Sequence, residues 1–259
     1  MEFLKAAKRR TLLSELTYIA LNIGLAVAIL VVVLVIESPV PAIALVLLSK
    51  WRILAVRPRY WFANIQANTV DLIVSLSFVV LLYSADGAFI AQCLITALYA
   101  AWLLFLKPRS KRSLVTLQAG IALFFGVLAL STVAYGWPLA IFVLLVWVIG
   151  YTTARHVLGS YEEPHAHFFS LIWGLFLAEI GWLTYHWMIA YSIPGVGHIM
   201  LPQLAIIMLA ISFVAERIYA NYEKHGLIKL GEVILPILLS VSTILVILLR
   251  FNDIATRVL

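Results

Sequence analysis

The chain has 259 residues, of which 64% are hydrophobic and 12% charged, and its formal net charge is +6. Soluble domains carry about 25% charged residues, so this composition excludes an ordinary soluble fold and indicates a membrane protein. The apolar runs are continuous rather than alternating, which excludes a β-barrel and predicts an all-α, polytopic transmembrane helix bundle. The single cysteine, Cys93, excludes an intrachain disulfide and any metal site built from several cysteines.

In chain order, a basic segment at 1–14 precedes about nine apolar spans within a single integral membrane domain. We expect these spans at about 16–36, 40–56, 61–84, 88–106, 113–134, 137–155, 168–193, 200–219 and 230–251. The second span is unusual, because it is cleanly apolar only over 42–49 before Lys50, Trp51 and Arg52. If it crosses the bilayer, its cations must snorkel or line a cavity.

The positive charges fall on alternate connections between these spans. Of the 18 Lys and Arg residues, 16 lie within 5–10, 50–59, 107–112, 155 and 217–229. This pattern predicts a cytoplasmic N-terminus, an outside C-terminus and a multi-pass protein of the cell inner membrane. It also accounts for the net positive charge, so we expect anionic lipid headgroups on the cytoplasmic side as partners, and no nucleic acid.

A polar stripe opens the third span. Trp61, Asn64, Asn68, Asp71 and Ser75 recur at spacings of three and four, which places them on one helical face. One hypothesis is a substrate-binding wall of a cytoplasm-facing pocket, formed by Trp61, Asn64, Asn68 and Asp71, with Asp71 as its acid. The alternative is that these groups join helices by interhelical hydrogen bonds.

The seventh span carries a carboxyl near its centre. Glu179 is the twelfth of 26 residues in 168–193, and Trp182 and His186 follow on the same helical face. An acid and a histidine along one face are typical of a proton relay, so Glu179 and His186 are candidates for proton coupling. The alternative is a neutral Glu179 hydrogen-bonded to a neighbouring helix.

The loop before that span concentrates ionisable groups. Glu162, Glu163, His165 and His167 form a candidate metal site, because carboxylates and imidazoles are common metal ligands. Glu162, Glu163 and His167 are also the residues that an intramembrane enzyme acting on lipid or prenyl substrates would use. The bland interpretation is a solvated loop.

Other polar residues predict structure rather than chemistry. Gln118, Glu216, Arg217 and Glu232 lie near the inner ends of spans, where Glu216 or Glu232 would pair with Arg155 or Arg217. No cofactor is expected. The sequence has no lysine in the middle of a span to hold retinal, no Gly-rich phosphate loop and no evident pair of axial histidines for haem.

The segment from Lys50 to Asp71, KWRILAVRPRYWFANIQANTVD, resembles a segment of uncharacterised polytopic inner-membrane proteins of small-genome candidate-phylum bacteria. This resemblance covers that segment alone and implies no activity and no site residues.

Three functions fit these observations. We expect a carrier-like or small-molecule- or lipid-binding membrane protein with a cytoplasm-facing polar pocket. The first alternative is a non-catalytic subunit of a larger membrane complex, with a membrane-protein partner or a second copy of the chain against it. The second is the intramembrane enzyme, although the sequence favours a protein that is not an enzyme.

Overall fold

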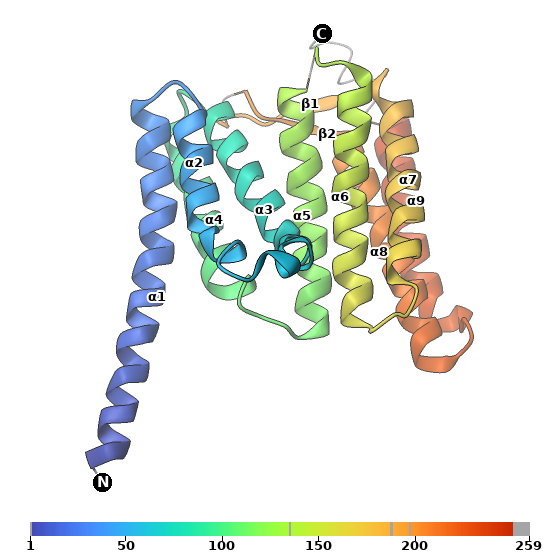
Figure 1. The fold of residues 1–259 in the computed structure, drawn as a ribbon. Helices are drawn as coiled ribbons and strands as arrows, with labels where there is room; N and C mark the ends of the chain where they lie inside the picture. Colours follow the sequence, from blue (N-terminus) through green and yellow to red (C-terminus); the bar gives the residue numbers. More distant parts are fainter. Residues whose placement is uncertain (1, 135, 187–188, 197, 251–259) are drawn as a thin grey trace.

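The computed structural model describes residues 2–134, 136–186, 189–196 and 198–250, whose helices run back and forth along one axis as a bundle (Figure 1). The α-helices are α1 (Glu2–Val35), α2 (Val40–Ser49), α3 (Trp61–Ser84), α4 (Phe89–Ala101), α5 (Arg112–Val133), α6 (Leu139–Ser160), α7 (Ala166–Tyr185), α8 (Gln203–His225) and α9 (Leu230–Arg250). Shorter turns are η1 (Trp51–Ile53), η2 (Pro58–Tyr60) and the π-helical η3 (Trp102–Leu106).

The prediction of an apolar helical bundle is confirmed. In the described residues, eight helices are long and apolar enough to cross a membrane. One element was not predicted: β1 (Ala190–Ser192) and β2 (Met200–Pro202) pair as a short antiparallel ribbon between α7 and α8.

The second predicted span is the clearest departure from the expected boundaries. In place of a helix over 40–56, α2 has 10 residues and ends at Ser49. Ten helical residues rise about 15 Å, half of the roughly 30 Å hydrocarbon core. Figure 1 shows α2 stopping partway along the bundle, where η1 and η2 turn the chain into α3. The apolar run in the sequence ends at the same place, before Lys50.

Other predicted boundaries shift by a few residues. The seventh span was placed at 168–193, but α7 ends at Tyr185 and β1 occupies the end of that range, while 187–188 lie outside the described residues. The eighth, placed at 200–219, extends to His225, where Gly226 adopts a left-handed φ of 69° and donates its N–H to Tyr222. The predicted basic segment at 1–14 is helical from Glu2 and forms the first part of α1. Met1 and residue 251 of the last predicted span lie outside the described residues.

The connections gather at two ends of the bundle. One end, here called the basic end, holds the turns after η3, after α6 and after α8, which carry residues 107–112, 161–165 and 226–229 (Figure 1). Arg112, at the start of α5, contacts Ser160 and Glu223, so the ends of α5, α6 and α8 lie together at this end. The β1–β2 ribbon lies at the opposite end, where His198 donates its backbone N–H to Ser84. Three of the loops predicted to share one side of the membrane therefore lie at one end of the protein, whereas the basic turn at 50–59 lies partway along the bundle.

Two apolar cores meet at α5. One packs α3 against α1, α2 and α4, around Val74, Phe78 and Tyr99. The other packs α5, α6, α7 and α8 around Val127, Phe142 and Met208. The α5–α8 half also contains the cavity described below.

The closest helix contact is between α6 and α7, where glycines replace larger side chains. A Cβ atom added at Gly174 would lie 3.0 Å from the carbonyl oxygen of Trp147 and 3.0 Å from the backbone nitrogen of Tyr151. A Cβ atom at Gly150 would lie 3.1 Å from the Cα atom of Gly174. Small residues let membrane helices approach to backbone contact, so these glycines fix the rotation of α7 against α6.

We expect Gly174→Ala to lower the free energy of unfolding by about 1–3 kcal/mol, because overpacking a close contact forces the backbone apart. Gly24→Ala is the matched control, since a Cβ atom at Gly24 in α1 meets nothing within 4 Å. Reversible unfolding in mixed detergent micelles measures both variants. If Gly174→Ala and Gly24→Ala had the same free energy of unfolding, the close α6–α7 contact at Gly174 would be contradicted.

Candidate functional site

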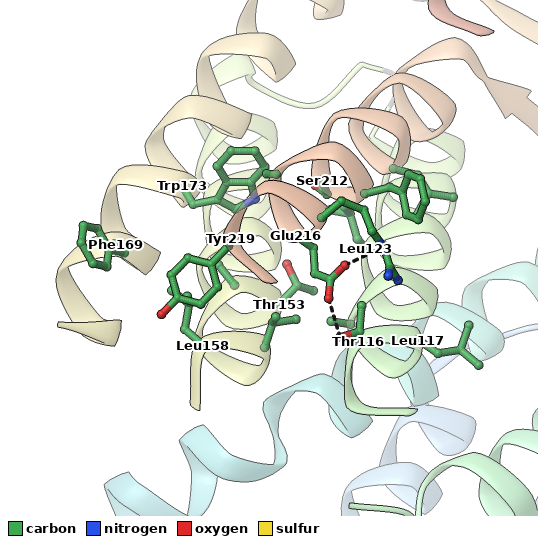
Figure 2. Close-up of a pocket in the computed structure, with 18 of the residues that line it drawn as sticks. Thr116, Leu117, Leu123, Thr153, Leu158, Phe169, Trp173, Ser212, Glu216 and Tyr219 are labelled. Carbon is green, nitrogen blue, oxygen red and sulfur yellow. Dashed lines mark hydrogen bonds and ion pairs between the residues drawn. The ribbon is translucent and has the colours of Figure 1, made fainter. Parts of the chain in front are cut away.

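A cavity of about 680 Å³ lies between α5, α6, α7 and α8, toward the basic end (Figure 2). Its walls are mainly apolar, and α5 contributes Leu123, α6 Leu158, α7 Trp173 and α8 Leu209. Along α8 the lining runs from Leu209 to Tyr219, which corresponds to about 15 Å of helical rise. This volume lies in the range of small-molecule sites.

Several wall residues are also part of the outer surface of the bundle. Phe169 and Ile172 on α7 are 42% and 50% exposed, Leu117 on α5 is 47% exposed, and Phe213 on α8 is 38% exposed. All four are apolar and all four line the cavity. The cavity is therefore continuous with an apolar outer surface of the kind that faces lipid.

The end of the cavity nearest the basic end is polar, and Glu216 is its centre. Glu216 Oε1 accepts hydrogen bonds from Tyr161 at 3.0 Å and from Thr116 at 3.4 Å. Its Oε2 lies 3.1 Å from Arg217 Nε, so the predicted pairing of Glu216 with Arg217 is confirmed. Burial, and then the neighbouring Glu216 charge, raise the pKa of Tyr161 to about 12, which keeps this phenol a hydrogen-bond donor.

One buried oxygen atom at this end, Ser212 Oγ, makes no hydrogen bond with the described residues. Glu216 Oε2, one helical turn away on α8, is also buried and is paired with Arg217 alone. Buried polar atoms are usually hydrogen-bonded, so Ser212, which lines the cavity, marks a place where a bound molecule would supply a hydrogen-bonding group.

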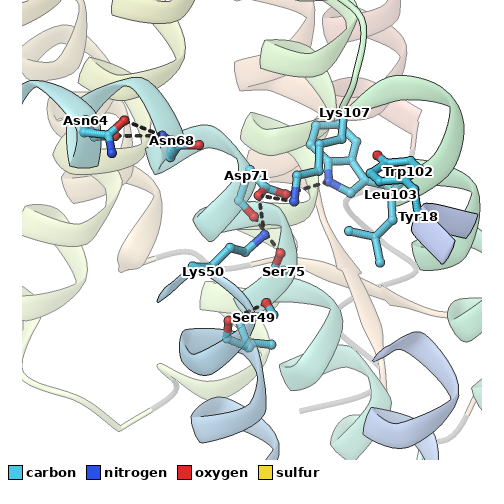
Figure 3. Close-up of polar contacts among 11 residues, drawn as sticks. Tyr18, Ser49, Lys50, Asn64, Asn68, Asp71, Ser75, Trp102, Leu103 and Lys107 are labelled. Carbon is cyan, nitrogen blue, oxygen red and sulfur yellow. Dashed lines mark hydrogen bonds and ion pairs between the residues drawn. The ribbon is translucent and has the colours of Figure 1, made fainter. Parts of the chain in front are cut away.

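The second polar site is a charge cluster around Asp71, which α2, α3 and η3 bring together (Figure 3). Lys50, directly after α2, donates to Asp71 Oδ2, and Lys107, directly after η3, lies 2.9 Å from the same oxygen. Trp102 Nε1 donates to Asp71 Oδ1 at 3.2 Å. The side chains of Lys50 and Asp71 are only 7% and 11% exposed, so this is a buried ion pair.

This cluster differs from the predicted pocket. Asp71 was expected to be the acid of a cavity wall, but two cations and an indole occupy its oxygens. Sequence reasoning did not find Lys50 and Lys107 as its partners. The available signal was Lys50 itself, a cation where the second span should still have been apolar.

The other members of the polar stripe bind the backbone. Asn64 Nδ2 donates to the carbonyl oxygen of Ile53 at 2.7 Å, and Trp61 Nε1 donates to the carbonyl oxygens of Leu54 and Val56. Asn68 Nδ2 donates to the carbonyl oxygen of Asn64 at 2.8 Å. Trp61 and Asn64 therefore hold the non-helical turn that follows α2.

Glu179 and His186 lie on the exposed face of α7. The His186 ring contacts Trp182 edge-on, with the ring centroids 5.8 Å apart. Across the parts of the chain that the structure describes, Glu179 makes neither a hydrogen bond nor an ion pair. The structure does not bring it to Asp71, which lies on α3 among α2, α4 and η3.

The four loop residues do not converge on one point. Glu163 accepts hydrogen bonds from the Tyr219 hydroxyl and from the backbone N–H of His165. His167 lies 3.3 Å from Arg155 Nη2 and 3.2 Å from the Tyr151 hydroxyl.

His165 contacts the Phe169 ring, and Glu162 adopts a left-handed φ of 56°. Among the described residues, no group of three or more His, Cys, Asp and Glu side chains could hold a metal ion.

No family model matches the chain, and no curated protein or solved structure matches it.

We expect Asp71→Asn to lower the free energy of unfolding by about 3 kcal/mol, because it leaves the buried Lys50 cation beside Lys107 without a counter-charge. Lys107→Gln should lower the free energy of unfolding by less, because Lys107 is 33% exposed and its loss leaves the Lys50–Asp71 pair intact. Adding Lys50→Met to Asp71→Asn should restore part of the loss. Reversible unfolding in mixed detergent micelles measures the two single variants and the double variant. If Asp71→Asn were as stable as the wild type, the ion pairs would not stabilise the fold.

The hydrogen bond from Tyr219, together with that from the His165 N–H, lowers the pKa of Glu163 below its ordinary value of 4.5. A lowered pKa in the folded state means that the contribution of Glu163 to stability is complete above about pH 4.5 and disappears as the pH falls further. Glu163→Gln and Tyr219→Phe should both weaken this acid dependence of the Tm. Glu162→Gln, which removes the same charge but not the Tyr219 contact, should retain it. If the Tm of the wild type and of all three variants falls equally at acid pH, the Glu163–Tyr219 contact is not the cause of the acid dependence.

Proposed function

We propose that this protein binds a single amphipathic, lipid-like molecule in the cavity between α5, α6, α7 and α8. The observation that carries this proposal is the combination, in one cavity, of apolar walls, exposed apolar rims and a polar end built on Glu216. The charged side chains of the lining, Glu216 and Arg217, lie at one end of the cavity. A lipid-like molecule needs polar groups only at one end, because its chain replaces hydrocarbon contacts with protein contacts.

The polar end favours a headgroup that donates hydrogen bonds. Ser212 Oγ is buried without a hydrogen bond, and the neighbouring Glu216 Oε2 is paired with Arg217 alone. An ammonium or hydroxyl group placed between them would bond Ser212 Oγ and give Glu216 Oε2 a second donor. Arg217, which pairs with Glu216 and is 48% exposed, would lie beside any phosphate of the same headgroup.

The orientation that fits this proposal places the basic end at the cytoplasmic face of the inner membrane. The basic end collects residues 107–112, 155 and 217–229, and anionic headgroups on that side attract such cations. Nine passes, with α2 as a half-length pass, would then leave the N-terminus inside and the C-terminus outside. The proposed ligand headgroup would lie at the cytoplasmic interface, where a carrier-like protein would take up or release a lipid.

Filling the cavity should remove the ligand. Gly120→Leu is the sharpest variant, because Gly120 lines the cavity and a Cβ atom there lies 3.5 Å from Leu209, an ordinary contact. The remaining atoms of the leucine would extend into the space that a lipid chain needs. Gly24→Leu makes the same change on α1, where nothing lies within 4 Å.

The measurement is native mass spectrometry of protein purified from nanodiscs of phosphatidylethanolamine and phosphatidylglycerol. We expect one retained lipid per chain for the wild type and for Gly24→Leu, and none for Gly120→Leu at unchanged Tm. Glu216→Gln should retain a lipid but lose the preference for phosphatidylethanolamine. A wild-type protein that releases every lipid, or a Gly120→Leu protein that keeps it, refutes the proposal.

A further inference from the structure

The exposed face of α7 carries a carboxyl group where the bundle offers it no partner. Glu179 is flanked on this face by Leu175, which is 56% exposed, and by Trp182 and Leu183, each 49% exposed. From Glu179 to the end of α7 at Tyr185 is about 9 Å of helical rise, more than a short acidic side chain spans. The carboxyl therefore faces the hydrocarbon region when α7 crosses the membrane.

The helix cannot turn this carboxyl into the bundle. The opposite face of α7 is held against α6 by Gly174 and Gly181, where added Cβ atoms would approach Trp147 and Val146 to 3.0 and 3.2 Å. Leu177, on the same inward face, is fully buried. A rotation of α7 that buried Glu179 would break the α6–α7 contacts at Gly174 and Gly181 and would expose Leu177.

No described residue of this chain makes a hydrogen bond or an ion pair with the carboxyl. His186, the nearest titratable side chain on the same face, is two turns away, about 10 Å along the helix. A polar group left unpaired in hydrocarbon costs several kcal/mol, and intramembrane carboxyl groups usually face a partner. A partner from outside the described bundle would remove this cost.

We propose that α7 pairs with α7 of a second copy of this chain, through a hydrogen-bonded pair of neutral Glu179 carboxyl groups. Hydrocarbon favours the neutral carboxyl, which both donates and accepts and is therefore complementary to itself. All copies have one orientation in a membrane, so Glu179 of a neighbouring copy lies at the same depth. A two-fold interface places the same residue opposite itself at the crossing point, and Leu175 and Trp182 would pack around the pair.

The experiment counts subunits of the full chain by single-molecule photobleaching in phosphatidylethanolamine–phosphatidylglycerol vesicles, over a range of protein-to-lipid ratios. The wild type should form dimers. Glu179→Leu, which keeps the helix apolar but removes the hydrogen bonds, should weaken dimerisation by about tenfold. Glu179→Gln should retain it, because the amide also donates and accepts.

Cross-linking locates the interface in a Cys93→Ser background. Leu175→Cys, one turn from Glu179 on the same face, should form an intermolecular disulfide, and adding Glu179→Leu should abolish it. Leu235→Cys on α9, which is 73% exposed, is the matched control and should not cross-link. A wild type that stays monomeric, a Glu179→Leu protein that dimerises equally well, or cross-links only at position 235 would each overturn the proposal.

Discussion

The ion pairs of Asp71 allow a helix of half the usual length to stand in a membrane bundle. α2 ends at Ser49, and the chain turns back through two short 3₁₀ turns before α3 begins. Backbone outside a helix is tolerated at membrane depth only where protein or water covers it. Here Asn64 and Trp61 on α3 donate to carbonyl groups of that turn, while Asp71 neutralises Lys50 at its start. The polar stripe of α3 thus replaces the hydrogen bonds that a longer α2 would have made within itself.

The same carboxylate connects the two halves of the bundle. Lys107, its second cation, lies in the turn between η3 and α5. Gln118 on α5 donates to the carbonyl oxygens of Leu106, the last residue of η3, and of Arg109 in that turn. Its own side-chain oxygen lies 2.9 Å from His156 on α6. A continuous series of polar contacts therefore runs from α2 to α6 toward the basic end. It positions α5 and α6, two of the four helices around the cavity, relative to the α1–α4 half.

The sequence predicts the bundle because apolar length and loop charge are properties of whole segments. The third span, expected at 61–84, matches α3 residue for residue, since an aromatic residue opens it and Asp86-Gly87 closes it. The cavity could not be predicted in this way. Its walls are ordinary apolar residues, such as Leu123 and Leu209, which in sequence look like any other residues of a span. Whether such residues touch or leave a space depends on how four helices are rotated about their axes.

That rotation also decides the role of each acid within the membrane-spanning helices. In sequence, Asp71, Glu179 and Glu216 are each an acidic residue within a predicted span, and nothing there shows which way each one faces. Asp71 faces inward and is paired with cations, and Glu216 lies at the polar end of a cavity. Glu179 faces outward because glycines turn the other side of α7 toward α6.

The packing of α7 links the cavity and the outward-facing acid. Gly150 and Gly174 bring α6 and α7 to backbone contact, whereas large side chains on α7 and α8, including Trp173 and Phe213, line the space between those two helices. One helix is thus tightly packed on one side and lines an apolar cavity on the other. A lipid-like ligand would contact α7 at Phe169, Ile172 and Trp173, whereas a second copy would meet Glu179, which lies about 10 Å beyond Ile172 along the helix. Because α7 contributes to both sites, a shift of this helix would change the shape of the cavity and the position of Glu179 together.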